Sequence, residues 1–282
     1  MTHTRAFNPI IAAAAVFVAA FSAAESDGAE LSQNWMLCVN KNVIFSRDLA
    51  ISGCTAIIQS GRETERNLAM AFNNRGTAYS DKKDYDRAIA DYSEAIRLNG
   101  NYATAFSNRG VAYRAKGEFD RAVADYSEAI RLDPKYVNAY DNRANLHLNK
   151  REYDPAIADF TAALQVQGSD RVALLGRCWA RTLGGQLPAA VADCSQLLRL
   201  QPGDAAALNM RGFAHLKAGQ TDKAIADFDA VLRSNPKNVG SLYGRGLARL
   251  KKHEAVQGNA DIAAAKALKP DVEHDFAKYD IR

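Results

Sequence analysis

The amino-acid sequence predicts an all-α solenoid built from helix–turn–helix repeats. Two stretches of helical length, each with apolar residues at helical spacing, recur with a period of 34 residues. A period of about 20 to 50 residues is typical of solenoids, in which each repeat buries its apolar face against its neighbours. One arginine marks the same position of all six repeats: Arg75, Arg109, Arg143, Arg177, Arg211 and Arg245.

Composition excludes some classes of protein. The chain has 282 residues, 48% of them hydrophobic, which is ordinary for a folded protein and argues against disorder. The net charge of +4 is small, and charges of both signs alternate along the predicted helices. A nucleic-acid partner is therefore not expected.

Residues 1–24 have the pattern of a secretory signal peptide. His3 and Arg5 precede an apolar run over 10–21, and the small residues Ser22-Ala23-Ala24 follow it. We expect cleavage after Ala24 and export, either to the bacterial periplasm or out of the cell. An uncleaved anchor and a buried helix are the alternatives.

The repeats divide most of the chain. The expected parts are a degenerate N-terminal capping repeat at 25–68, six full repeats, and a polar C-terminal tail at 273–282. Terminal repeats are often atypical because one face must cap the stack. The six repeats are expected at 69–102, 103–136, 137–170, 171–204, 205–238 and 239–272.

Local residue types predict where the second helix of each repeat begins and ends. Acidic tripeptides such as 152–154 precede it, so the last aspartate is expected to cap the helix, with Pro155 at its first position. Prolines such as Pro134 and Pro202 follow its end.

Recurring residues at fixed repeat positions give the chain a family resemblance. Position four is aromatic or Leu (Phe72, Phe106, Tyr140), position eight is small (Gly76, Gly110, Ala144), and position twenty is small again (Ala88, Ala122, Ala156). In these residues the sequence resembles the tetratricopeptide repeat family. The resemblance implies a right-handed solenoid and a non-enzymatic scaffold or adaptor. Its first helices would line a concave face that binds another protein as a peptide or short helix.

The four cysteines fall into two pairs with the same spacing. Cys38 and Cys54 are sixteen residues apart, as are Cys178 and Cys194, and both pairs replace the Gly and Tyr that otherwise pack across a hairpin. Together with export, this predicts two disulfides within repeats. Buried free cysteines are the alternative, and no histidine lies at metal-ligand spacing nearby.

Each repeating arginine is followed sixteen residues later by an aspartate. The expected structural ion pairs include Arg75–Asp91, Arg109–Asp125 and Arg143–Asp159. The degenerate repeat lacks both partners, which favours pairing within a repeat. A row of arginines for an anionic ligand is the alternative.

Candidate binding residues differ between the early and later repeats. The early first helices carry polar residues at positions expected to face inward, and an amide can pair with a peptide backbone by donating and accepting at once. The candidates are Asn74, Asn108, Arg114, Asn142 and Asn145. A solvated polar face is the alternative.

The later repeats carry apolar residues at the same positions, among them Trp179, Phe213 and Leu216. An exposed apolar patch of this extent would mark a protein-binding site. The alternatives are that the C-terminal tail folds back into the groove, or that packing hides these residues. A second functional hypothesis is a self-associating component of the cell envelope, which would form a homo-oligomer.

No pattern favours catalysis. His147 and His215 share a repeat position that holds tyrosine elsewhere, so they are expected to be packing substitutes. The carboxylates belong mainly to the aspartate position and the turns, and no phosphate-binding glycine loop is present. No catalytic residue, metal site or cofactor is expected.

Overall fold

The computed structural model describes residues 30–40 and 44–281, and the chain divides into two compact units, 1–132 and 133–282. The predicted signal peptide at 1–24 lies outside the described residues. The regular secondary structure of the described residues is helical throughout. None of the described helices has the length and hydropathy needed to cross a bilayer.

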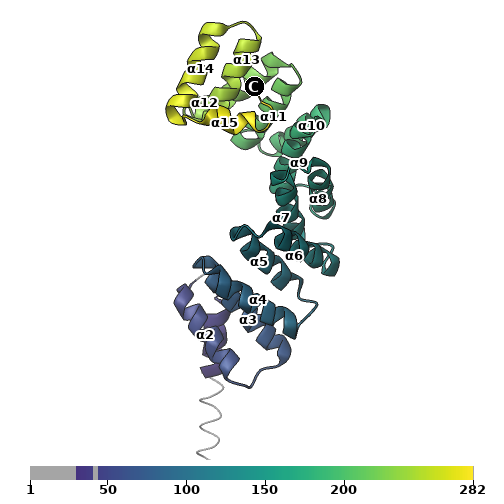
Figure 1. Cartoon of the computed structure of the whole chain (residues 1–282), viewed down its shortest axis with the longest axis vertical. Helices are drawn as coiled ribbons and strands as arrows, with labels where there is room; N and C mark the ends of the chain where they lie inside the picture. The colour runs from purple at the N-terminus through teal and green to yellow at the C-terminus, as the bar shows by residue number, and fades with distance from the viewer. Residues whose placement is uncertain (1–29, 41–43, 282) are drawn as a thin grey trace, which may run out of the picture. The chain divides into compact units, whose positions relative to one another are not determined.

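The first unit contains a helical stretch at residues 30–39 and five further helices (Figure 1). Consecutive helices pack against one another as antiparallel hairpins, and α3 also contacts α5. The helices are α2 (Arg47–Gln59), α3 (Glu65–Asp81), α4 (Tyr85–Leu98), α5 (Ala103–Ala115) and α6 (Phe119–Leu132).

The second unit contains four more hairpins and a short last helix. The helices are α7 (Val137–Asn149), α8 (Tyr153–Val166), α9 (Arg171–Leu183), α10 (Leu187–Leu200), α11 (Ala205–Lys217), α12 (Thr221–Ser234), α13 (Val239–Lys251), α14 (Ala255–Leu268) and α15 (Val272–Ala277). The first helices α7, α9, α11 and α13 also contact one another in order. They form the inner layer of this unit, and α8, α10, α12 and α14 form the outer layer.

The second helices begin two residues earlier than the sequence predicts. The N-cap of α4 is Asp84, whose side chain accepts a hydrogen bond from the backbone of Arg87. The N-cap of α8 is Glu152, and Pro155 is the third helical residue. A proline is tolerated there because the first-turn N–H groups have no partner within the helix.

Close approach at glycine joins the two helices in several of the hairpins. A Cβ atom at Gly110 would lie 2.8 Å from the Tyr126 ring, and one at Gly212 would lie 2.7 Å from the Phe228 ring. Both rings are completely buried. The small residue on the first helix therefore leaves the space that the aromatic residue on the second helix fills. The predicted fold class, an all-α array of helix–turn–helix repeats, is confirmed.

Candidate functional site

The repeating arginines form two-point ion pairs with the aspartates of their own repeats. Arg109 donates from Nε to Asp125 Oδ2 at 2.9 Å and from Nη2 to Asp125 Oδ1 at 2.8 Å. The same geometry recurs in all six repeats, with distances between 2.6 and 3.0 Å. These bonds raise the pKa of Arg109 above its usual value. Two nitrogens of each guanidinium thus bind an aspartate of the same chain. This weakens the alternative that the repeating arginines form a row that binds an anionic ligand.

The remaining nitrogen reaches the preceding repeat, a contact that the sequence analysis missed. Arg109 Nη1 donates to Ser93 Oγ at 3.0 Å, and Arg177 Nη1 donates to Thr161 Oγ1 at 3.2 Å. Arg245 instead reaches the carboxylate of Asp229 at 2.6 Å. The pattern that would have revealed it is the recurrence of a hydroxyl residue every 34 positions: Ser93, Ser127, Thr161 and Ser195.

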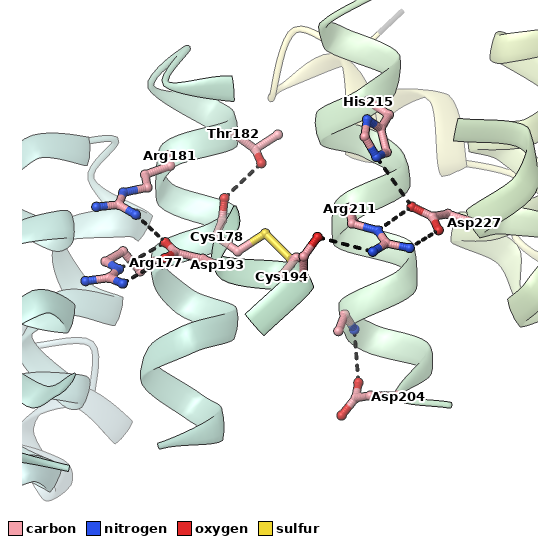
Figure 2. The surroundings of a disulfide bond; sticks show 12 residues. Arg177, Cys178, Arg181, Thr182, Asp193, Cys194, Asp204, Arg211, His215 and Asp227 are labelled. Atoms are coloured by element: carbon pink, nitrogen blue, oxygen red, sulfur yellow. Dashed lines mark hydrogen bonds and ion pairs between the residues drawn. A yellow bond between two sulfur atoms is a disulfide. The ribbon is translucent and has the colours of Figure 1, made fainter. Parts of the chain in front are cut away.

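Two disulfides join helices within a hairpin. Cys38 is bonded to Cys54, and Cys178 is bonded to Cys194, as the sequence predicts. Figure 2 shows the second disulfide between α9 and α10, beside Asp193. That carboxylate accepts hydrogen bonds from both Arg177 and Arg181. The covalent bond and the ion pairs therefore link the same two helices.

The polar face of the first unit is partly engaged internally. Asn108 on α5 donates to the side chain of Asn73 on α3 at 3.0 Å, and Asn73 is only 5% exposed. Asn74 is half-buried and lines a cavity of about 160 Å³. Arg114 is exposed. Asn74 and Arg114 are therefore better placed to meet a partner than Asn73.

In the second unit, α7 carries two of the predicted asparagines. Asn142 is half-buried, and Asn145 donates to the backbone carbonyl of Asp141 at 2.7 Å. Asp141 is itself buried, and its Oδ1 atom has no hydrogen-bond partner. Burial, helped by the nearby charge of Asp170, raises the pKa of the Asp141 carboxyl to about 7. No sequence pattern indicates this buried carboxyl.

The apolar residues of the later repeats form one aromatic face on α9, α11 and α13. We call this set the aromatic face: Trp179, Phe213, Leu216, Tyr243 and Leu247. All except Trp179 are buried, with exposures between 3% and 8%. The rings of Trp179 and Phe213 meet edge to face, with centroids 6.2 Å apart. These residues are not an exposed patch in this structure.

The chain's own C-terminal segment, residues 272–281, covers the aromatic face. The ring of Phe276 stacks on Phe213 at 4.9 Å and on Tyr243 at 5.1 Å. Tyr279 meets Trp179 edge to face at 5.6 Å, and Ile281 is 2% exposed. Of the alternatives for these repeats, the structure thus has the folded-back tail.

Residues 272–281 carry both polar and apolar side chains. Glu273 and His274 are exposed, as expected of polar residues. The tail is amphipathic because Phe276 and Tyr279 are three residues apart and therefore share one side of a helical turn. Ile281 follows them into the same apolar surface.

The two histidines expected to be packing substitutes lie near carboxylates of their hairpins. His215 is buried, its Nδ1 lies 2.8 Å from Gln220 Oε1, and burial lowers its pKa. His147 Nδ1 lies 2.5 Å from Glu152 Oε2. Across residues 30–40 and 44–281, no group of three or more His, Cys, Asp or Glu residues is arranged to hold a metal ion.

Comparisons with known proteins agree with this geometry. A family model described as TPR repeat matches residues 111–150. Models described as tetratricopeptide repeat match residues 69–102 and, in two copies, residues 142–205 and 209–272. No curated protein has a matching sequence.

Solved structures share the fold. A tetratricopeptide repeat protein from Parabacteroides merdae matches with a TM-score of 0.64 and 20% identity, over 90% of this chain and 99% of that one. PilW, a type IV pilus biogenesis factor, matches with a TM-score of 0.62 and 19% identity, over 72% and 94%. YrrB, described as having an unusual peptide-binding site, matches with a TM-score of 0.54 and 23% identity, over 64% and 93%.

The regular arginine–aspartate pairs, the glycine–aromatic contacts and the family models lead to one conclusion. The chain belongs to the tetratricopeptide repeat family.

Proposed function

We propose that this protein is a non-enzymatic adaptor that binds a peptide or short helix of another protein on the inner layer formed by its first helices. Proteins of this family are generally non-enzymatic scaffolds that bind other proteins or peptides. The proposed organisation is a leader at 1–24, a capping repeat at 25–68, six repeats over 69–272 and a closing segment at 273–282.

The observation that carries this proposal is the occupation of the aromatic face. Residues 272–281, which include helix α15, lie against side chains from three successive first helices, α9, α11 and α13. The inner layer of this unit therefore accepts a short helix that presents aromatic side chains. An amphipathic helix bound in a groove is a recurring mode of peptide recognition.

Polar side chains of the first helices would add backbone recognition, in each unit by itself. In the first unit, Asn74 and Asn108 lie on neighbouring first helices, α3 and α5, and in the second unit Asn142 occupies the same repeat position on α7. Arg114 supplies an exposed positive charge on α5. We propose that these side chains contact an extended part of the partner.

We place this activity outside the cytoplasm. Disulfides persist in oxidising compartments such as the bacterial periplasm, and the chain contains two. The pattern at 1–24 is that of a cleaved signal peptide.

Self-association as an envelope component is the alternative function. It requires an exposed apolar surface in the later repeats, and residues 272–281 cover that surface. The adaptor therefore has the stronger support.

The test is an affinity pull-down from envelope extract with the mature protein. We compare the wild type with Asn108→Ala/Asn142→Ala and with Trp179→Ala/Phe213→Ala. If one captured protein is lost specifically with either double variant, the substituted residues belong to its binding site. Arg131→Ala on α6 is the matched control, because its side chain is exposed on an outer helix. A partner retained by both pairs, or no specific partner at all, would contradict the proposal.

A further inference from the structure

The C-terminal segment occupies the aromatic face, a surface on which the proposed function would place a partner. Its aromatic side chains contact one residue from each of three successive first helices: Trp179 on α9, Phe213 on α11 and Tyr243 on α13. An ordinary terminal segment would only need to cover the end of the stack. Residues 272–281 contact side chains of three repeats.

We propose that residues 272–281 are a displaceable intramolecular ligand, and that the partner replaces them with a helical turn of the same chemistry. This inference rests on the proposed function and adds to it how access to the site is controlled. The protein would be closed in isolation and would open when a competing segment binds.

The contacts that hold the segment are weak enough for it to dissociate. Helix α15 has six residues, too few to be stable as an isolated helix, so its structure depends on its docking. Its ion pairs are largely exposed, as for Lys266 and Glu273 at 2.9 Å, and such pairs stabilise little. Arg151 also donates to the backbone carbonyl of Lys278. Most of the attachment therefore comes from the apolar side chains.

The aromatic face is supported independently of the segment. Phe213 packs edge to face on Phe228 of α12, with centroids 5.0 Å apart, and Phe228 is completely buried. Leu216 and Leu247 lie on helices that are already paired within hairpins. If the segment leaves, the face remains in place as an apolar patch on three helices. Patches of this kind mark protein-binding sites.

The contacts of the segment define the partner's chemistry. Phe276 and Tyr279 are three residues apart, and Asp280 and Ile281 follow directly. Asp280 and Ile281 line a cavity of about 190 Å³ together with Leu216, Lys217 and Lys251. A carboxylate suits the two lysines, and an aliphatic side chain suits Leu216. The partner is therefore a peptide with two aromatic residues three apart, followed by an acidic and an aliphatic residue.

Competition with the segment would lower the apparent affinity for a partner. A ligand that binds only the open form has its apparent Kd raised by the inverse of the open fraction, so an open fraction of about 1% raises it about 100-fold. Weakening the segment should therefore tighten binding in trans.

The test uses a fluorescent synthetic peptide with the sequence of residues 269–281 as the probe. It is titrated against the full-length mature wild type and against Phe276→Ala/Tyr279→Ala. We expect the apparent Kd to be at least about tenfold lower for the variant. Adding Phe213→Ala should abolish this gain. Glu273→Ala/His274→Ala is the matched control, because both side chains are exposed, and it should behave as the wild type.

Hydrogen exchange of the wild type gives a second, independent measurement. We expect the amides of α15 to exchange much faster than those of α13. With the probe bound, the amides of α15 should still exchange faster than those of α13. Equal protection of α15 and α13 would make the segment a fixed part of the core and would overturn the proposal. Equal probe binding by the wild type and a folded Phe276→Ala/Tyr279→Ala variant would overturn it as well.

Light scattering separates a partner from a second copy. A wild-type dimer that Phe276→Ala/Tyr279→Ala converts to a monomer would show that the segment binds another copy, which would overturn the partner proposal. The probe requires no natural partner. Probe binding without any captured protein would therefore refute the adaptor alone, and capture without probe binding would refute the displaceable segment alone.

Discussion

Arg109 and Asp125 are joined by two parallel hydrogen bonds across one hairpin, and the same guanidinium donates to Ser93 of the preceding repeat. The arginine thus sets the register of its own two helices and links them to the neighbouring hairpin. A planar guanidinium with its donors in a fixed fork suits this double role, whereas a lysine would not. This dual role explains why arginine occupies the position in every full repeat.

The first prediction concerns the loss of the aspartate. Asp125→Ala should lower the free energy of unfolding by about 3 kcal/mol, because it leaves a largely buried guanidinium without its counter-ion. Arg131→Ala is the control, since Arg131 pairs with Glu128 on an exposed surface and such pairs are worth at most about 1 kcal/mol. Urea denaturation of the three proteins measures both values. Equal costs for the two variants would contradict the structural role of the pair.

The second prediction concerns close packing at glycine. Gly110→Ala should overpack the core at a cost of up to about 3 kcal/mol, because the new methyl group would lie 2.8 Å from the buried Tyr126 ring. Alanine gains roughly 1 kcal/mol over glycine in a helix, so the expected net destabilisation is about 1–2 kcal/mol. Gly100→Ala is the control, since no atom lies within 4 Å of its added Cβ. Thermal unfolding midpoints of the wild type and both variants measure the effect. A higher midpoint for Gly110→Ala than for the wild type would refute the close packing at this position.

The third prediction concerns the disulfide between α9 and α10. Cys178→Ser/Cys194→Ser should lower the free energy of unfolding by about 3 kcal/mol, the value expected for a loop of this length. Reductant should lower the stability of the wild type but have a smaller effect on this variant, which keeps only the other disulfide. Intact mass after alkylation, with and without reductant, verifies the bonds. Four alkylated thiols in native exported protein would show that neither disulfide forms.

The fourth prediction concerns the buried carboxyl of Asp141. Its pKa is about 7 in the folded protein, against an ordinary value of 3.8. Between these values the folded state holds a proton that the unfolded state has lost. The stability contributed by this group is therefore complete below about pH 4 and is lost as the pH rises through about 7.

Asp141→Asn removes this dependence. The variant should be about 1–3 kcal/mol more stable than the wild type at pH 8, because no buried charge remains, and the gain should shrink at pH 5. Asp154→Asn on α8, where the side chain is exposed, is the control and should change stability little at either pH. Urea midpoints at both pH values measure the effect. A gain that is the same at pH 5 and pH 8 would contradict it.

The 34-residue period was sufficient to predict the architecture. Arg75 and Asp91 recur in phase, and the degenerate repeat lacks both residues, which favoured their pairing within a hairpin. The disulfide between Cys178 and Cys194 could be predicted because the residues at those two positions pack against each other in the remaining repeats. A pattern that recurs six times resolves local ambiguities that a single segment leaves open.

The C-terminal segment shows where sequence reasoning ends. Residues 272–281 occur once and are too short for helical periodicity to be measured, and their docking depends on side chains that come from three other helices. The contact of Arg109 with Ser93 was missed for a different reason. A serine at that position is compatible with an exposed helix surface, and only the stacking of neighbouring hairpins brings the hydroxyl to the arginine.

The proposed function requires that the first helices bind a protein segment. Site-specific photo-crosslinking in living cells probes this surface, with the crosslinking residue at Arg114 on α5 or at Arg131 on α6. Both side chains are exposed, but they lie on the first and the second helix of the same hairpin. We expect one crosslinked protein from position 114 and none from position 131. Crosslinks from position 131 alone, or with equal yield from both positions, would contradict it.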